Sequence, residues 1–148
     1  MNLNVMVKKL RDSATLPRYA TEGAAAADLC ADLDAPVTIL PGERALIGTG
    51  IAISPERGDL VALIFSRSGM GAKSGISLSN SVGVIDSDYR GELKVSLINH
   101  GHEPYTVNHG DRIAQLAFLP IFTAHFVQVE DLDETARGEG GFGSTGKN

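Results

Sequence analysis

Short apolar runs separated by turn signals follow one another along most of the chain. Runs with the character of strands occupy residues 4–10, 37–40, 45–53, 60–65, 93–98, 105–107, 112–119 and 124–129. Glycine, proline, aspartate and asparagine punctuate the chain between them at intervals of about eight to twelve residues, which is the spacing of a sandwich, barrel or jelly roll. We therefore predict an all-β fold of the jelly-roll-like type.

Two segments interrupt this pattern. Residues 24–27 are alanines with helical propensity, but Gly23 precedes them and an acidic stretch follows closely, so a short strand or extended segment is expected there. Residues 66–73 are polar and contain glycine, and one helical turn could begin at Ser68. The fold is thus expected to contain at most one short helix.

A carboxylate and an aromatic ring lie in the turn between two apolar-patterned runs within residues 78–99. Residues 82–85 are apolar around Gly83, and residues 93–98 alternate with the period of a half-buried strand. We interpret this stretch as a β-hairpin whose tip presents Asp86 and Tyr89. Either these side chains face a pocket or the hairpin is an ordinary surface turn, because aspartate and glycine favour turns for backbone reasons alone.

The composition indicates one domain and excludes several classes of protein. The chain has 148 residues, 43% of them hydrophobic, which suffices for one sizeable core. A net charge of -5 argues against general binding to nucleic acid or to a membrane surface. The single Cys30 excludes an internal disulfide, and neither a signal-like start nor a membrane-length apolar run is present. A cytoplasmic location is expected.

The chain changes character near residue 130. Residues 130–136 are acidic and residues 137–148 are rich in glycine, so we predict a β domain over 1–129 and a flexible arm over 130–148. Residues 141–147 match parts of two phosphate-binding motifs, but the helix that those motifs need cannot follow before Asn148. Glycine amides, hydroxyls and Arg137 could still wrap a polyphosphate while Phe142 stacks on a base; the alternative is a disordered tail.

Two further positions are candidates for binding phosphate and metal. Arg67, Ser68 and Gly69 could bind an anion through a guanidinium, a hydroxyl and backbone amides, or they could be a polar turn. Asp28 stands alone among apolar neighbours and could help hold a hydrated Mg²⁺, or it could cap a turn. The histidines at 100, 102 and 109 lack a fourth ligand at a telling spacing, so we interpret them as solvent histidines.

Taken in order, five segments resemble the motifs of the trimeric dUTPase family, whose members split dUTP into dUMP and diphosphate. They are residues 27–31 (ADLCA), 67–73 (RSGMGAK), 80–91 (NSVGVIDSDYRG), 110–116 (GDRIAQL) and 137–146 (RGEGGFGSTG). The resemblance implies a mostly-β, jelly-roll-like (β-clip) subunit that forms a homotrimer with shared active sites. It also implies dUTP as the substrate, Mg²⁺ as the cofactor, and an arm that closes over the nucleotide.

The resemblance also implies roles for individual residues. Asp86 would orient and deprotonate the attacking water, Gln115 would lie by the α-phosphate or that water, and Tyr89 would leave no room for a 2′-hydroxyl. Asp28 would touch the Mg²⁺ shell through water. The uracil would be read by Asn80, Gly83, Val84, Ile85 and Lys94. The phosphates and the ring would be held by Arg67, Ser68, Gly69, Arg137, Phe142, Gly143, Ser144 and Thr145.

Two alternative functions are weighed against this one. The dCTP deaminases share the fold and the trimer, but their catalytic glutamate would fall near residues 97–99, where this chain has no acid. A dUTPase-like regulatory protein would act through a partner, yet pure binding would not require Asp86, Tyr89, Gln115 and Arg137 together. Two small departures from the family pattern, Ser66 in place of proline and Gly71 in place of alanine, remove no phosphate donor.

Overall fold

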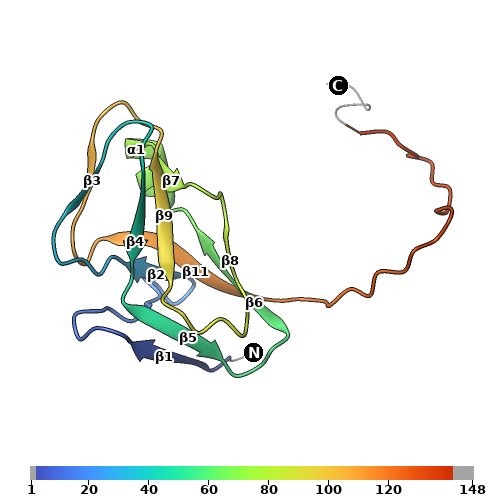
Figure 1. Cartoon of the computed structure of the whole chain (residues 1–148), viewed down its shortest axis with the longest axis horizontal. Coiled ribbons are helices and arrows are strands. Elements are labelled where there is room, and N and C mark those ends of the chain that lie inside the picture. Colours follow the sequence, from blue (N-terminus) through green and yellow to red (C-terminus); the bar gives the residue numbers. More distant parts are fainter. Residues whose placement is uncertain (1–2, 142–148) are drawn as a thin grey trace.

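The computed structural model of the chain describes residues 3–141 and shows a β-sheet body from which the C-terminal part of the chain extends (Figure 1). The described residues form β1 (Val5–Lys9), β2 (Ala27–Cys30), β3 (Val37–Ile39), β4 (Arg44–Gly48), β5 (Ile51–Pro55), β6 (Leu60–Phe65), α1 (Ser68–Ser74), β7 (Ile76–Leu78), β8 (Gly83–Ile85), β9 (Lys94–Asn99), β10 (Tyr105–Val107) and β11 (Arg112–Pro120). The prediction of a mostly-β fold with at most one short helix is confirmed.

Antiparallel pairing joins these strands into four sheets. The largest has the order β2-β11-β6-β8 and the next β4-β9-β7, while β1 pairs with β5 and β10 with β3. Ile64 and Leu116 of the largest sheet belong to the same buried cluster as Val95 and Leu97 of the three-stranded sheet. The two larger sheets therefore enclose a common hydrophobic core.

The two segments that interrupted the strand pattern form a short strand and a short helix. The strand β2 covers residues 27–30, so it begins at the last of the four alanines and leaves residues 24–26 in a loop. Helix α1 begins at Ser68, as expected, after Arg67, whose backbone is extended. The helix ends at Gly75, which has φ of 68°, and a Cβ there would lie 2.5 Å from the backbone nitrogen of Gly101. Glycine therefore satisfies both the left-handed cap and the close backbone approach. No helix within residues 3–141 is long and apolar enough to cross a membrane.

The predicted single strand over residues 45–53 is wrong. The chain forms β4 and β5 on either side of a joint at Thr49 and Gly50, and Gly50 has φ of 65°. Strand β4 pairs with β9, whereas β5 pairs with β1. The left-handed conformation at Gly50 lets the chain leave one sheet and enter another.

The predicted β-hairpin around Asp86 and Tyr89 is also wrong. Strand β8 pairs with β6, with Ile85 opposite Ala62, and β9 pairs with β4 and β7 in a different sheet. Residues 86–93 are therefore a connection between sheets rather than the tip of a hairpin. Strand β7, which was not predicted as a separate element, completes the three-stranded sheet.

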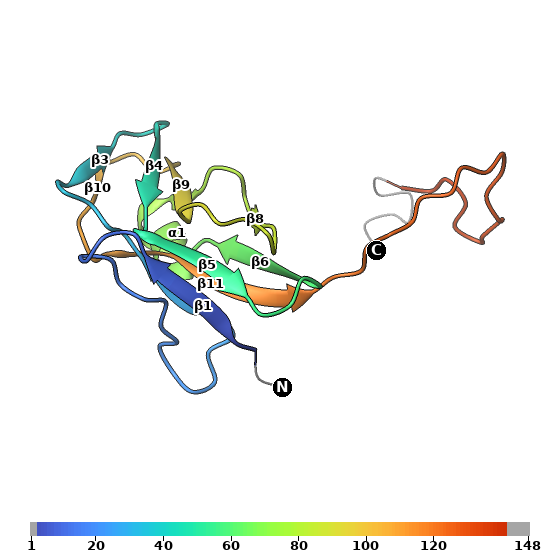
Figure 2. The ribbon, with the colours of Figure 1, turned by 60° about the horizontal axis from the view of Figure 1, so that its bottom comes forward.

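The predicted last strand over residues 124–129 does not form within the described chain. After β11, residues 121–141 run away from the body as an extended segment without strand structure (Figures 1 and 2). Apolar side chains on this segment face solvent, with Phe122 101% and Phe126 92% exposed. The boundary between domain and arm at residue 129 stays a prediction.

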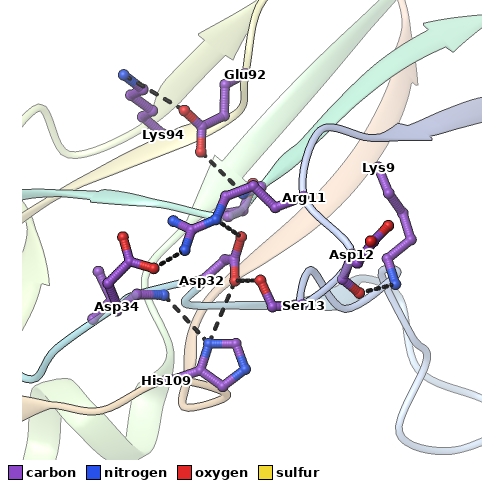
Figure 3. A network of polar contacts seen from close by, with 12 residues as sticks. Lys9, Arg11, Asp12, Ser13, Asp32, Asp34, Glu92, Lys94 and His109 are labelled. Atoms are coloured by element: carbon purple, nitrogen blue, oxygen red, sulfur yellow. Dashed lines mark hydrogen bonds and ion pairs between the residues drawn. The ribbon is translucent and has the colours of Figure 1, made fainter.

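A buried carboxylate links several connections between strands (Figure 3). Asp32, whose side chain is 1% exposed, accepts a hydrogen bond of 2.7 Å from the Ser13 hydroxyl at Oδ1. Its Oδ2 lies 3.3 Å from Arg11 Nε without the alignment of a hydrogen bond. His109 Nδ1 lies 3.4 Å from Oδ1 and accepts the Leu33 N–H at 3.3 Å. This Asp32 network joins the segments that follow β1, β2 and β10.

Candidate active site

A small pocket opens beside the edge strand β8. It has a volume of about 210 Å³ and brings together the five residues predicted to read the base, together with four that sequence reasoning did not single out as site residues: Asn80, Gly83, Val84, Ile85 and Lys94, with Leu46, Ile64, Leu78 and Ser96. Within the described chain β8 pairs only with β6, so its other edge keeps free N–H and C=O groups. Such an edge can form hydrogen bonds with a planar ring that carries both donors and acceptors.

Gly83 lets this strand lie close to its neighbour. A Cβ at Gly83 would come within 3.1 Å of Ile64 Cβ on β6, tighter than ordinary van der Waals contact. Gly83 itself is buried, whereas Val84 is 64% exposed. Buried Gly83, Ile64 and Leu78 therefore line the inner part of the pocket, whereas Val84 stands at its exposed rim.

The turn after β8 carries the candidate catalytic carboxylate and the aromatic ring. The Tyr89 N–H donates to the Asp86 carbonyl at 3.1 Å, and the Ser87 hydroxyl donates to the Gly58 carbonyl at 3.1 Å, which fixes the turn on the β5–β6 connection. The Asp86 carboxylate is exposed, and no hydrogen bond to it is formed within residues 3–141. The Tyr89 hydroxyl donates to the Glu92 carbonyl at 3.1 Å.

A buried carboxylate held by two guanidinium groups forms a second cluster. Asp28 on β2 is 6% exposed; its Oδ1 lies 3.2 Å from Arg67 Nε and its Oδ2 3.0 Å from Arg112 Nη1. Arg67 Nη1 also donates to the Arg112 carbonyl at 3.1 Å. Gln115 on β11 stands opposite Asp28, and exposed Ser68 and the adjoining amides begin α1. The cluster thus combines two cations with donor groups around one carboxylate.

Arg112 is a component of this cluster that sequence reasoning missed. Its guanidinium side chain is 53% exposed and lies beside Asp28. The sequence did contain a signal for it, because Arg112 lies inside the 110–116 segment that resembles a family motif and is a cation in that segment. Burial raises the pKa of the neighbouring Cys30 thiol above its ordinary value, and the Asp28 charge adds to the shift.

The two groups lie toward opposite ends of β6. Ile85 is paired with Ala62, whereas Gln115 is paired with Phe65. Asp86 lies one residue beyond Ile85, and Arg67 lies two residues beyond Phe65 in the opposite direction along the sheet. At about 3.3 Å per residue, the separation of Asp86 and Arg67 along the strand is on the order of 20 Å. One chain therefore does not bring the carboxylate of the first group to the arginine of the second.

The arm holds the third group of predicted residues. Arg137 is exposed, and its Nε donates to the Gly140 carbonyl at 2.9 Å. The arm leaves the body where Pro120 of β11 pairs with Leu60 of β6, at the end of β6 that is nearer to Asp86. Phe142, Gly143, Ser144 and Thr145 lie outside the described residues.

The fold and the site together define a β-sheet protein that presents an open strand edge, a partly exposed aromatic ring and two neighbouring arginines, which are the kinds of group that can bind a nucleotide. The chain belongs to the dUTPase family, whose model matches residues 12–146.

Curated relatives of similar length match nearly the whole chain. A deoxyuridine 5'-triphosphate nucleotidohydrolase of Desulfitobacterium hafniense is 56% identical over 131 residues, which are 88% of this chain and 87% of the relative. The corresponding protein of Coxiella burnetii is 53% identical over 148 residues, 100% of this chain and 97% of the relative. This chain therefore spans the length that these relatives share.

Solved structures with the same fold include dUTPases of bacteriophages. A dUTPase of Staphylococcus bacteriophage 80alpha with dUpNHpp has a TM-score of 0.87 and 29% identity, covering 97% of this chain and 98% of that one. A dUTPase from phage phi11 of S. aureus, described with a structural Mg(II) ion, has a TM-score of 0.79 and 26% identity, covering 88% of this chain and 99% of that one.

Proposed function

We propose that the protein is a dUTP diphosphatase, a hydrolase that converts dUTP into dUMP and diphosphate by attack of water on the α-phosphorus. The observation that carries this proposal is the pocket of about 210 Å³ at the open edge of β8, with the Asp86–Tyr89 turn directly after that strand. Membership of the dUTPase family supports it. The reaction would keep uracil out of DNA and supply dUMP for thymidylate synthesis.

The pocket suits uracil better than the other bases. Uracil offers an N3 donor and an O4 acceptor, and the free N–H and C=O groups of β8 alternate along its edge, so that they can pair with both. Cytosine reverses this pattern and would leave polar groups unpaired, which is costly in a buried site. Asn80 and the Lys94 backbone would complete the recognition. A pocket wide enough only for uracil would also reject the thymine methyl.

The chemistry requires a positioned water and a base rather than a covalent nucleophile. Asp86 would take the proton of the attacking water, and Gln115 would orient that water or the α-phosphate. The exposed Asp86 carboxylate makes no hydrogen bond within the described chain, so both its oxygens can accept one. Tyr89 would pack under the deoxyribose and exclude a ribose 2′-hydroxyl.

Cationic and amide donors would neutralise the triphosphate as charge moves onto the leaving diphosphate. Arg67 supports this role because its guanidinium is 25% exposed and already beside Arg112, so two cations meet at one place. The complete set that we propose for the phosphates and for covering the base is Arg67, Ser68, Gly69, Arg137, Phe142, Gly143, Ser144 and Thr145.

The residues present fit a Mg²⁺ ion that is held mainly by the substrate. Residues 3–141 contain no group of three or more carboxylate, histidine or cysteine side chains placed to hold a metal alone. Mg²⁺ commonly keeps several waters and takes one or two protein carboxylates beside substrate phosphates. Asp28 would contact the hydrated ion through water, and the ion would supply charge neutralisation at the phosphates.

A homotrimer with shared active sites accounts for the separation of the two groups along β6. Asp86 of one copy would meet Arg67 of a neighbour, and the arm would reach a third surface. The extended segment that begins at residue 121 supports assembly because its large apolar side chains, Phe122 and Phe126 among them, are almost fully exposed in one chain. The body offers an apolar-lined hollow of about 610 Å³ beside β1. We place the trimer in the cytoplasm, with a domain over 1–129 and an arm over 130–148.

The test is to incubate the purified protein with dUTP, dCTP, dTTP or UTP and Mg²⁺ and to measure diphosphate. Rapid release is expected from dUTP and poor release from the other three. Ammonia from dCTP would identify a deaminase instead, although residues 97–99, near which the acid of a deaminase would fall, contain none, and the Asn99 amide donates to the Ile39 and Glu103 carbonyls. Binding of dUTP without turnover would identify a regulatory protein. Light scattering during gel filtration measures the trimer separately.

A further inference from the structure

Gly91 lies directly against the ring of Tyr89. A Cβ built on Gly91 would come within 2.3 Å of Tyr89 Oη, 2.5 Å of its Cζ and 3.0 Å of its Cε2. Atoms at these distances overlap, because real Cβ contacts shorter than 3.0 Å are essentially never seen. The ring therefore occupies the space that any side chain at position 91 would fill.

The backbone of Gly91 does not itself require glycine. Its φ lies outside the left-handed region, unlike that of Gly42, Gly50, Gly75 or Gly110. A left-handed φ therefore does not exclude alanine here, and the obstacle to a side chain is contact with Tyr89. The space that a side chain at position 91 would fill is taken by Tyr89, a candidate site residue. Gly91 therefore points to a role in the site.

Two contacts hold the Tyr89 ring in place. The hydroxyl donates to the Glu92 carbonyl at 3.1 Å, and one side of the ring rests on Gly91. The side chain remains 45% exposed, so part of it stays free for a ligand. The ring is in contact with the main chain at Gly91, so it cannot move any closer to the backbone there.

We propose that Gly91 determines sugar specificity by setting the position of the Tyr89 ring. The proposal rests on the proposed function, in which this ring packs under the deoxyribose. With alanine at position 91, the ring must move by about 1 Å for its hydroxyl to reach ordinary contact distance, since 3.4 minus 2.3 is 1.1. The displaced ring no longer fits the deoxyribose and no longer fills the space of the 2′-hydroxyl.

The effect on folding is small for the same reason that the effect on the site is large. Because the overlapping atoms are the far end of a half-exposed side chain, the ring can move away without disturbing the core. Gly91→Ala should therefore unfold at a temperature close to that of the unmodified protein. A merely structural glycine would show the opposite combination, lower stability with unchanged selectivity.

The experiment compares kcat/KM for dUTP and UTP in Gly91→Ala and in a matched control, Gly23→Ala. A Cβ at Gly23 meets no atom within 4 Å, and its φ is also outside the left-handed region. We expect the preference for dUTP over UTP to fall about 10- to 100-fold in Gly91→Ala, since a misplacement near 1 Å can cost that much. The control should keep the preference of the unmodified protein.

A double variant shows whether the effect passes through Tyr89. Tyr89→Ala should already lose the preference, and adding Gly91→Ala should change it no further. An unchanged preference in Gly91→Ala, or a further loss in the double variant, would overturn the proposal. A crystal structure of Gly91→Ala gives a readout that does not need activity: an undisplaced ring would overturn the proposal. If the unmodified protein failed to hydrolyse dUTP while the ring moved, the proposed function would fail and the positioning of Tyr89 by Gly91 would stand.

Discussion

Replacing Gly50 by alanine should destabilise the fold through two separable terms. Gly50 joins β4 to β5 with φ of 65°, and a Cβ there would lie 2.2 Å from Asp32 Oδ2 and 2.7 Å from Ala14 Cβ. The left-handed backbone alone costs alanine about 1–2 kcal/mol. Overpacking of a filled site adds about 1–3 kcal/mol. The Asp32 carboxylate cannot withdraw easily, because it is buried and held by Ser13.

The expected loss for Gly50→Ala is therefore about 2–5 kcal/mol, or on the order of 10 °C in Tm for a chain of this length. Gly42→Ala is the matched control, because Gly42 has φ of 80° but a Cβ there would meet nothing within 4 Å. The control should lose only the backbone term, about 1–2 kcal/mol. Urea and thermal unfolding are measured for both at one protein concentration, since assembly makes Tm depend on it.

Equal losses for the two variants would refute the reasoning, because they would show that the Asp32 network makes room for a methyl group without cost. A second comparison isolates the contact further. In an Asp32→Ala background the closest overlap is gone, so Gly50→Ala should cost less there than in the unmodified protein. Additive effects would show that the carboxylate plays no part.

Three further outcomes are expected. Asp86→Asn should keep dUTP affinity and lower kcat about 10²- to 10⁴-fold, and an active variant would show that Asp86 is not the base. Deleting residues 137–148 should weaken turnover strongly and leave the oligomer unchanged in light scattering; a monomeric product would contradict the role of the arm as a cover. Burial raises the pKa of Cys30, so the thiolate forms at higher pH in the folded protein. The pH at which alkylation accelerates should therefore be higher for the native protein than for the urea-unfolded chain. The shift favours the protonated thiol of the folded state, so its contribution to stability is lost as pH rises through the folded pKa, and Cys30→Ser should remove that dependence.

The sequence indicated the position of most strands but not their partners. Alternation over residues 93–98 correctly indicated a half-buried strand, because that pattern reports which face is covered. It does not report which strand lies alongside, and residues 86–93 are long enough to cross from one sheet to another. The predicted hairpin therefore failed although both of its strands exist. The joint at Gly50 was not recognised because the residues on both sides of it are largely apolar, so that β4 and β5 read as one continuous strand.

Residues 124–129 are rich in strand-forming residues yet form no strand, because a strand needs a partner and none of the described strands pairs with them. The pocket residues Asn80, Val84 and Lys94 were found from the family resemblance and lie together in the structure. Arg112 was missed because an arginine on a strand is usually a surface charge. Only the pairing of β11 with β2 places it beside Asp28.

In the proposed trimer with shared active sites, the placement of Asp86 and Arg67 toward opposite ends of β6 would have a genetic consequence. A copy that has lost one of them would still carry the other intact, so two inactive alleles could complement each other within one assembly. In a ring of three that contains both kinds of copy, one junction of the three combines the two intact ends. With equal expression about three quarters of the rings are mixed, so about a quarter of the junctions would be functional. Recessive lesions at the two ends of one strand would then behave as if they lay in separate genes.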